Sequence, residues 1–509
     1  MNKNAVKNTI QSNDIYIGKD ILELLSGGMY SNPLDIYREY IQNSFDAIQV
    51  DLISKISDGP QVIITIEPKT RTISLLDYGP GISNKNFISV LTSIGNSGKR
   101  SNNYIGFRGV GRLGGLGYAK RIIMRSKSQQ DNHAFEMVWD GVKLRQLLND
   151  FSQRINLQTL LAEIITVNIL KDTDGESSFF EVILEGVMRS KNDVLLNEKE
   201  IYTYLSQVAP VPINPTFRYK ETIDNLLESH SISTGIIIHL SRMDKTIYRP
   251  FADTFAVTAN VTDSYKDIEL FTISGSSEEV DAIGWILHHN YLGSLPKLSS
   301  IRGVRARYKN LQVGGEDIFQ IMFPESRFNS WAVAEIHILN PKIKPNARRD
   351  NFEHNIHLDN LLNQLTVKGG QIARECRISS KDRTIKRRAI SLVDSLKDNE
   401  FLLSRNMVSG IHADATKDII IETINELALL FTKVGDLDTE MSECHTIWEE
   451  FKSKYSVSEF GVLDNFQPLT EQDGDKHEAY QEIIQAIIDV MPDRPKALNL
   501  INRVLSRVL

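Results

Sequence analysis

An acidic side chain followed by two glycines stands directly after a predicted β-strand. In Asp77-Tyr78-Gly79-Pro80-Gly81 the carboxylate follows the apolar pair Leu75-Leu76. A carboxylate held at a strand end can accept a hydrogen bond from an exocyclic amine, and the glycines beside it let a planar ring approach the backbone. Adenine offers such an amine, although this pattern taken alone is more often a plain turn.

A second cluster is a glycine-rich segment that suits phosphate. Six glycines lie between Gly106 and Gly117, so many backbone N–H groups are unshielded and can surround an anion at a helix start. The preceding Ser97-Gly98-Lys99-Arg100 adds a hydroxyl and two cations. The segment is not a dinucleotide-binding fingerprint, because a long polar stretch rather than a first strand precedes it. It is not a Walker A loop either, because Ser93 stands where that loop needs its first glycine.

A third cluster lies on a predicted helix. Glu39, Asn43 and Asp46 are four and three residues apart, a spacing that projects side chains from one face of an α-helix. Ile41 and Phe45 lie on another face. One side of this helix is therefore polar and convergent. For this cluster alone, a solvated side of an amphipathic helix is the favoured interpretation.

The elements that must position these clusters follow from the hydrophobic periodicity. The pattern predicts helices near 21–25, from Pro33 to about Ile53 and over 198–208. It predicts strands at 62–66, 72–76, 121–126, 134–139, 180–184, 235–240, 304–313 and 333–339. After Gly369-Gly370 the strand signals stop and helical spacing continues to the end.

Composition restricts the class of protein. The chain has 509 residues, 41% hydrophobic and 24% charged, which is typical of a multidomain globular protein. The net charge of -7 gives no overall attraction to nucleic acid or to an acidic membrane. Cys376 and Cys444 are too few for a disulfide framework. We therefore expect a cytoplasmic protein without a membrane segment.

Together and in this order, the three clusters resemble the GHKL ATPase superfamily. Glu39, Asn43 and Asp46 resemble its N box, Asp77-x-Gly79-x-Gly81 its first glycine box, and Gly106-x-x-Gly109-x-Gly111 its second. Within the superfamily the chain is most similar to the heat-shock protein 90 chaperones and their bacterial relatives. The resemblance is specific over roughly residues 17 to 126 and weaker to about 355.

The resemblance implies a role for each matched residue. Glu39 would be the general base that activates the attacking water, and Asn43 would supply a side-chain oxygen to Mg²⁺. Asp77 would bind the adenine amine, while Asp46 would line the pocket wall. The other expected nucleotide-binding residues are Gly79, Gly81, Ile82, Ser97, Gly98, Lys99, Gly106, Gly109, Val110 and Gly111. The expected cofactors are ATP and Mg²⁺, and the segment from about 84 to 117 would be a mobile lid.

Two further site residues are expected from the same resemblance. In the family a threonine on the closing strand assists the adenine-binding acid; here Ser178 is the expected substitute and Thr234 the alternative. The run 346–350 resembles the middle-domain loop whose arginine reaches the terminal phosphate and offsets charge developing in phosphoryl transfer. Aligning the family's asparagine and acid places that arginine at Arg349. Arg348 is the alternative, since Glu353 replaces an expected glutamine.

The expected fold class is α+β. Residues 1–190 would form a Bergerat-fold ATPase sandwich, 191–370 an α/β middle or transducer domain, and 371–509 an all-α region for dimerisation or partner binding. An apolar stripe at Leu498, Ile501, Leu505 and Val508 needs a surface to dock on.

The expected function is a slow Mg-ATPase that drives lid closure and domain rearrangement on a protein client or partner. A homodimer is expected. The resemblance alone suggests an accessory ATPase in a bacterial antiviral defence system. The alternative is a nucleic-acid-directed ATPase resembling MutL or the MORC proteins. A basic segment over 374–388 supports this alternative. That segment is better explained as a solvated helix or an ion-pair partner. A sensor histidine kinase is disfavoured, because a phospho-accepting helix pair would have to precede the ATP domain.

Overall fold

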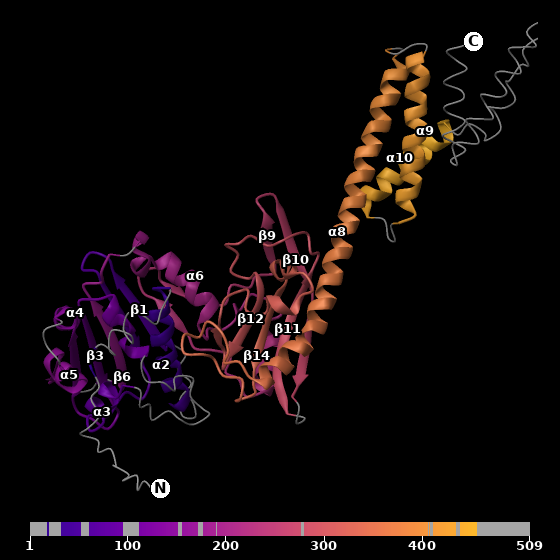
Figure 1. Cartoon of the computed structure of the whole chain (residues 1–509). Coiled ribbons are helices and arrows are strands. Elements are labelled where there is room, and N and C mark those ends of the chain that lie inside the picture. Colours follow the sequence, from indigo (N-terminus) through magenta and orange to yellow (C-terminus); the bar gives the residue numbers. More distant parts are fainter. Residues whose placement is uncertain are drawn as a thin grey trace, which may run out of the picture. The chain divides into compact units, whose positions relative to one another are not determined.

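The protein is described by a computed structural model, which divides into two compact units, Met1–Lys381 and Asp382–Leu509 (Figure 1). The structure describes residues 18–19, 32–51, 61–94, 111–150, 155–171, 177–189, 191–275, 279–405, 407, 411–433 and 438–455. The helix expected near 21–25 and the apolar stripe from 498 to 508 lie outside these residues.

An eight-stranded sheet forms the first layer of the N-terminal region, in the order β5-β4-β3-β6-β2-β1-β7-β8. Neighbouring strands are antiparallel except β1 and β7, which are parallel. The strands are β1 (Val62–Glu67), β2 (Thr72–Asp77), β3 (Arg121–Lys127), β4 (Ala134–Asp140), β5 (Ile165–Leu170), β6 (Phe179–Glu185), β7 (Ile238–Leu240) and β8 (Lys245–Thr246).

Helices form the second layer. Alternate residues of β1, namely Val62, Ile64 and Ile66, share one buried core with Ile41 and Phe45 of α2, as period-2 and period-3.6 patterns require of packed layers. The helical elements here are α2 (Asp35–Asp51), α3 (Phe87–Thr92), η2 (Gly111–Gly117), α4 (Gly141–Asn149), α5 (Leu157–Ile164), η3 (Lys191–Leu196) and α6 (Glu198–Val208). The expected α/β sandwich is confirmed.

A second, six-stranded sheet has the order β13-β12-β14-β11-β10-β9. Its strands are β9 (Thr254–Thr258), β10 (Val261–Ser274), β11 (Val280–His289), β12 (Gly303–Tyr308), β13 (Leu311–Val313) and β14 (Val333–Ile338). One face packs on the first part of α8 (Ile356–Ser404), and the other packs on α7 (Lys220–Ser229). The short η4 (Gln320–Met322) and η5 (Ser326–Trp331) precede β14.

Two strand predictions differ from the structure. The strand expected over 235–240 was placed in the second domain, but β7 joins the first sheet beside β1. The single strand expected over 304–313 is the antiparallel hairpin β12–β13. Lys309 and Asn310 both have positive φ, 49° and 66°, so the chain reverses there in a left-handed turn that no glycine marks.

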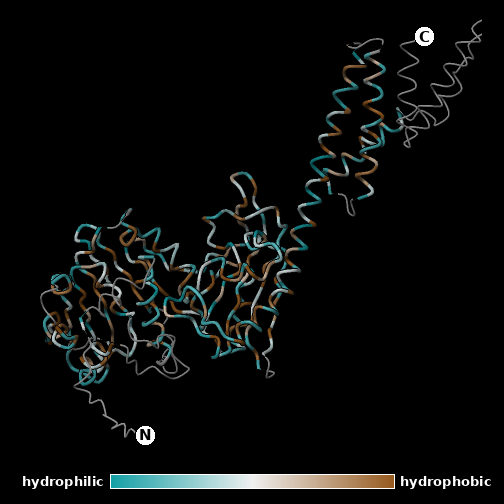
Figure 2. The backbone as a smooth tube through the Cα atoms, viewed as in Figure 1, coloured by the Kyte–Doolittle hydropathy of each residue, from teal (hydrophilic) through white to brown (hydrophobic). Residues whose placement is uncertain are grey.

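The described part of the C-terminal region, which ends at Tyr455, is helical, as expected. In the second unit the later part of α8 shares a core with α9 (Ile411–Phe431) and α10 (Thr439–Tyr455). Trp448 donates from Nε1 to the Ile424 carbonyl oxygen at 3.0 Å. Figure 2 shows hydrophobic residues recurring along these helices between hydrophilic ones, the pattern of a helix buried on one side.

The glycine pair in α8 yields a stability prediction, because the helix runs through both residues. A Cβ at Gly369 would stand 2.2 Å from the Met322 carbonyl oxygen, whereas a Cβ at Gly370 meets nothing within 4 Å. Gly369→Ala should therefore lower the free energy of unfolding by about 1–3 kcal/mol through overpacking. Gly370→Ala should raise it by about 0.5–1 kcal/mol. Urea denaturation of both variants measures this; equal effects would contradict the close approach.

Candidate functional site

Helix α2 carries the polar residues expected from its spacing. The side chains of Glu39 and Asp46 are buried, and Asn43 is half-buried. Burial raises the pKa of Tyr40, the neighbour of Glu39, well above its usual value, and the Glu39 charge adds to this shift. The polar face of α2 is therefore covered by protein rather than solvated, against the interpretation favoured for the cluster alone.

Asp77 occupies the expected position at the end of β2. It is buried; its Oδ1 accepts a hydrogen bond from the Gly79 N–H at 3.1 Å, and its Oδ2 accepts one from the Ser44 hydroxyl at 2.7 Å. Ser44 lies on α2, five residues after Glu39. Helix α2 therefore contacts the strand-end acid through Ser44. About a turn and a half earlier it carries Glu39, the carboxylate expected to activate water.

The glycines after Asp77 allow close backbone packing. Gly81 has φ +68°, and a Cβ there would stand 2.1 Å from the Lys127 carbonyl oxygen, so only glycine fits. The next residue, Ile82, donates its N–H to the Ser126 hydroxyl at 2.8 Å, and that hydroxyl donates to the Phe179 carbonyl oxygen at 3.0 Å. The first glycine box is thereby fixed to β3 and to the start of β6.

The end of the second glycine box lies against α2. A Cβ at Gly111 would be 2.3 Å from Oε2 of Glu39, so the η2 backbone passes directly beside the carboxylate. Tyr40 donates its hydroxyl to the Arg112 carbonyl oxygen at 3.3 Å. The Arg112 guanidinium, whose pKa burial lowers to about 10, donates to the carbonyl oxygens of Val90 and Ser93. These contacts join η2 to α2 and to the end of α3.

An arginine on the loop between β14 and α8 reaches the same carboxylate. Nε of Arg349 lies 3.4 Å from Oε1 of Glu39, and both side chains are about nine-tenths buried. Arg38 donates to the Arg348 carbonyl oxygen at 3.2 Å, while the Arg348 side chain is exposed. The structure therefore brings Arg349, and not the Arg348 side chain, to Glu39.

The Arg349 loop is a closed turn. Pro345 and Phe352 form an isolated bridge, and the Asn346 N–H donates to the Asn351 carbonyl oxygen at 2.8 Å. Arg349 itself has φ 58°, a left-handed conformation that costs a non-glycine residue energy and needs support from its surroundings.

Comparison with known proteins matches the part of the chain that holds Glu39 and Asp77. A family model described as "Histidine kinase-, DNA gyrase B-, and HSP90-like ATPase" matches residues 35–162. This region belongs to the GHKL ATPase superfamily. The GHKL match covers α2, both glycine boxes and the sheet from β1 to β4.

Several chaperone proteins named HtpG are similar to the chain. The protein from Campylobacter jejuni subsp. doylei is 26% identical over 203 residues, covering 36% of this chain and 32% of the relative. That from Buchnera aphidicola is 30% identical over 157 residues, covering 26% and 24%. That from Helicobacter pylori is 23% identical over 141 residues, covering 24% and 23%. The chain thus matches a third or less of the length of these relatives.

A magnesium ion would have few protein ligands here. Among the described residues no group of three or more His, Cys, Asp or Glu side chains could hold a metal. Asn43, half-buried on the same helix as Glu39, offers an amide oxygen. This fits Mg²⁺, which in phosphate sites takes one or two protein ligands and completes its octahedron with phosphate and water.

Part of the expected site is not described. Ser97, Gly98, Lys99, Gly106, Gly109 and Val110 lie outside the described residues. Ser178 directly precedes β6, whose Phe180 pairs with Asp77, and its role stays a prediction. Sequence reasoning missed Ser44 and Ser126, the hydroxyls that contact Asp77 and Ile82. Neither serine carries a motif, so only the packing of α2 and β3 reveals them.

The basic segment over 374–388 is engaged in ion pairs. Three of its cations contact acidic side chains, in the pairs Arg377–Glu325, Lys386–Asp438, Lys386–Glu440 and Arg388–Glu426. These contacts favour the ion-pair interpretation over a phosphate-tracking surface. In the described part of the chain, no helix is both long and apolar enough to cross a bilayer.

The Ser44 contact generates a binding prediction. Ser44→Ala removes the hydroxyl that fixes Oδ2 of Asp77. Because Asp77 itself remains, we expect ATP affinity to fall about three- to tenfold, which is less than the full worth of a hydrogen bond to a charged group. Titration of a fluorescent ATP analogue measures it. Ser74→Ala is the control, because that hydroxyl bonds Glu181 instead; a matching loss in the control would remove the argument for Ser44.

Proposed function

We propose that the chain is a heat-shock-90-type ATPase that binds Mg-ATP and hydrolyses it slowly. The observation that carries the proposal is the approach of Arg349 to Glu39 at 3.4 Å. The carboxylate expected to activate water is therefore next to the cation expected to contact the terminal phosphate. The strand-end acid Asp77 is fixed to the same helix through Ser44.

In the proposed reaction a water oxygen attacks the terminal phosphorus of ATP. The new P–O bond forms as the bond to the bridging oxygen of ADP breaks, and the water proton passes to the Glu39 carboxylate. The Arg349 guanidinium offsets negative charge on the transferring phosphoryl group. In this step Arg349 leaves Glu39 for phosphate, which frees the carboxylate to accept the proton.

Mg²⁺ would be held by the Asn43 amide oxygen and by phosphate oxygens. Bound there, the ion supplies charge neutralisation for the phosphates. Asp77 accepts a hydrogen bond from the adenine amine, and Gly79, Gly81 and Ile82 line the base. The Gly111 backbone, packed against Glu39, faces the phosphates.

Turnover is slow because conformational steps precede chemistry. Closure of the expected lid over residues 84–117, of which 95–110 lie outside the described residues, and docking of the Arg349 loop must both complete the site before hydrolysis. We propose that this cycle rearranges a protein client or partner, that the chain acts in the cytoplasm as a homodimer, and that it serves as an accessory ATPase in bacterial defence. The client and defence roles rest on the resemblance to chaperones. The MutL-like or MORC-like alternative is disfavoured by the ion-paired basic segment.

Two substitutions separate binding from chemistry. Glu39→Ala should retain ATP binding but lower kcat by at least about a hundredfold, because the general base is lost. Asp77→Asn should weaken ATP binding about ten- to a hundredfold, because a charged hydrogen-bond acceptor is lost. Phosphate-release assays and equilibrium ATP binding measure both. Glu39→Ala turning over at the wild-type rate would refute the base assignment.

The two adjacent arginines form a matched pair. Arg349→Ala should lower kcat about a hundredfold with ATP affinity within about threefold of wild type, as expected for a cation used in the transition state. Arg348→Ala should leave both constants near wild type, since its side chain is exposed. Steady-state kinetics decide; the reverse pattern would transfer the role to Arg348.

A further inference from the structure

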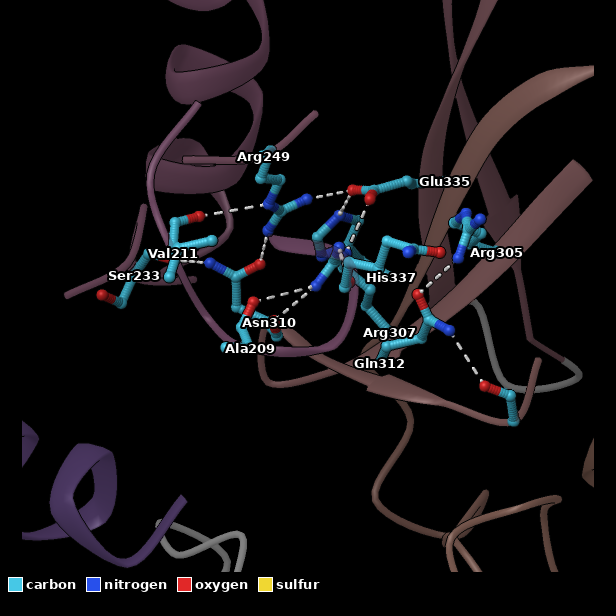
Figure 3. A network of polar contacts seen from close by, with 12 residues as sticks. Ala209, Val211, Ser233, Arg249, Arg305, Arg307, Asn310, Gln312, Glu335 and His337 are labelled. Atoms are coloured by element: carbon cyan, nitrogen blue, oxygen red, sulfur yellow. Dashed lines mark hydrogen bonds and ion pairs between the residues drawn. The ribbon is translucent and has the colours of Figure 1, made fainter. Parts of the chain in front are cut away.

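Two arginines, a glutamate and a histidine lie on one buried face of the second sheet (Figure 3). Arg305 and Arg307 alternate along β12 with Val304 and Ala306, which belong to the apolar core on the opposite face. Parallel pairing sets Arg305 beside Glu335 and Arg307 beside His337 on β14. Charged side chains at these depths are costly unless their hydrogen bonds are satisfied.

The Glu335 carboxylate in this group contacts two guanidinium groups. Arg249 contacts Oε2 of Glu335, and Nε of Arg307 lies 2.8 Å from Oε1. Burial opposes ionisation of Glu335, but Arg249 and Arg307 together hold the pKa of its carboxyl well below the usual value. Burial lowers the pKa of His337 to about 4, so it is neutral at pH 7. The other guanidinium N–H groups must therefore find neutral acceptors.

Several of those acceptors lie in the last turn of α6 and in the segment that follows it. Arg307 donates to the carbonyl oxygens of Gln207 at 2.7 Å and Ala209 at 3.4 Å, and Arg249 donates to that of Val211 at 3.2 Å. Helix α6 is in turn tied to α2, because the Tyr204 hydroxyl donates to Asp35 at 2.6 Å. The charged group thus holds the end of α6 and the segment that leads from it to α7, which packs on the second sheet.

The same group reaches the Arg349 loop through a glutamine on β13. Arg305 donates from Nη1 to Oε1 of Gln312 at 3.1 Å, and Gln312 donates from Nε2 to the Gly314 carbonyl oxygen at 3.0 Å. The Gly314 N–H donates to the Arg349 carbonyl oxygen at 2.8 Å. Gly314 has φ +67°, and a Cβ there would lie 2.9 Å from the Asp350 carbonyl oxygen, so the two backbones are in direct contact.

Gln312 is the link on which this chain of contacts depends. Arg305 is buried, and its Nε and Nη2 have no hydrogen-bond partner among the described residues, so the bond to Gln312 is its main polar anchor there. A buried amide that accepts from one side and donates to the other fixes both neighbours. The left-handed conformation of Arg349 needs such support.

We propose that Gln312 is a positioning residue that sets the Arg349 loop for phosphate contact. Strand β12 connects it to the end of α6, because Arg305 bonds Gln312 while Arg307 bonds the carbonyl oxygens of Gln207 and Ala209. This inference rests on the proposed function of Arg349. Through this network the position of the loop is tied to the position of the helix that leads back to α2.

The test is Gln312→Glu in the full-length chain. The carboxylate still accepts from Arg305 but can no longer donate to the Gly314 carbonyl oxygen, which it repels. We expect kcat for ATP hydrolysis to fall about three- to tenfold, the effect of one misplaced hydrogen bond, with the KM for ATP within about twofold of wild type. Gln312→Met, which removes both bonds at similar volume, should lower kcat at least as much.

A double-mutant cycle separates positioning from general destabilisation. In the Arg349→Ala background, Gln312→Glu should cause no further loss of kcat, because its effect passes through Arg349. Gln364→Glu is the matched control: its side chain bonds the Ser274 carbonyl oxygen elsewhere in the domain, and wild-type kinetics are expected.

Four results would count against the inference. A multiplicative loss in the double variant, or a loss in the Gln364 control equal to that of Gln312→Glu, would make the effect structural. Wild-type kcat in both Gln312 variants, with a slow Arg349→Ala, would overturn the inference and leave the proposed function intact. A wild-type protein that does not hydrolyse ATP would overturn the proposed function and this inference with it.

Discussion

The approach of the Arg349 guanidinium to the Glu39 carboxylate is the contact on which the rest of the site depends. Both groups are about nine-tenths buried, and such charges persist together only where their neighbours fix the geometry. The η2 backbone at Gly111 lies against the other carboxylate oxygen, at a separation that only glycine permits. Arg349 reaches Glu39 from a backbone position with left-handed φ. A phosphate entering here would replace a carboxylate as the partner of a cation that is already in place.

Helix α2 joins the two ends of the candidate pocket. Ser44 fixes the acid expected to bind adenine, and Glu39 stands one and a half turns earlier on the same rigid element. The opposite face of α2 is locked into the apolar core through residues such as Ile41 and Phe45. A shift of this helix would therefore disturb the base end and the phosphate end together. This explains why the polar face of α2 is buried although its spacing alone resembles a solvated face.

The sequence predicted the features that depend on local hydrophobic periodicity and on turn residues. The β1–β2 hairpin, the strand-end position of Asp77, the α2 helix and the α+β architecture follow from periodicity and from turn residues. The features that the sequence did not predict depend on contacts between elements that are distant in the chain. Ser44 gains its role only when α2 lies against the end of β2. The turn at Lys309 and Asn310 is left-handed without a glycine, so one strand was expected where two exist. Helix α8 continues through Gly369, where the Met322 carbonyl oxygen leaves no room for a side chain, so this glycine marks close packing and not the end of a helix.

A crystal structure of the full-length protein with Mg²⁺ and a non-hydrolysable ATP analogue tests the central claim most directly. The account predicts the adenine amine on the Asp77 carboxylate, and the terminal phosphate between Glu39 and Arg349 with the direct contact of these two residues broken. A nucleotide bound elsewhere would contradict it. So would a terminal phosphate remote from Arg349 while the pair with Glu39 stays intact.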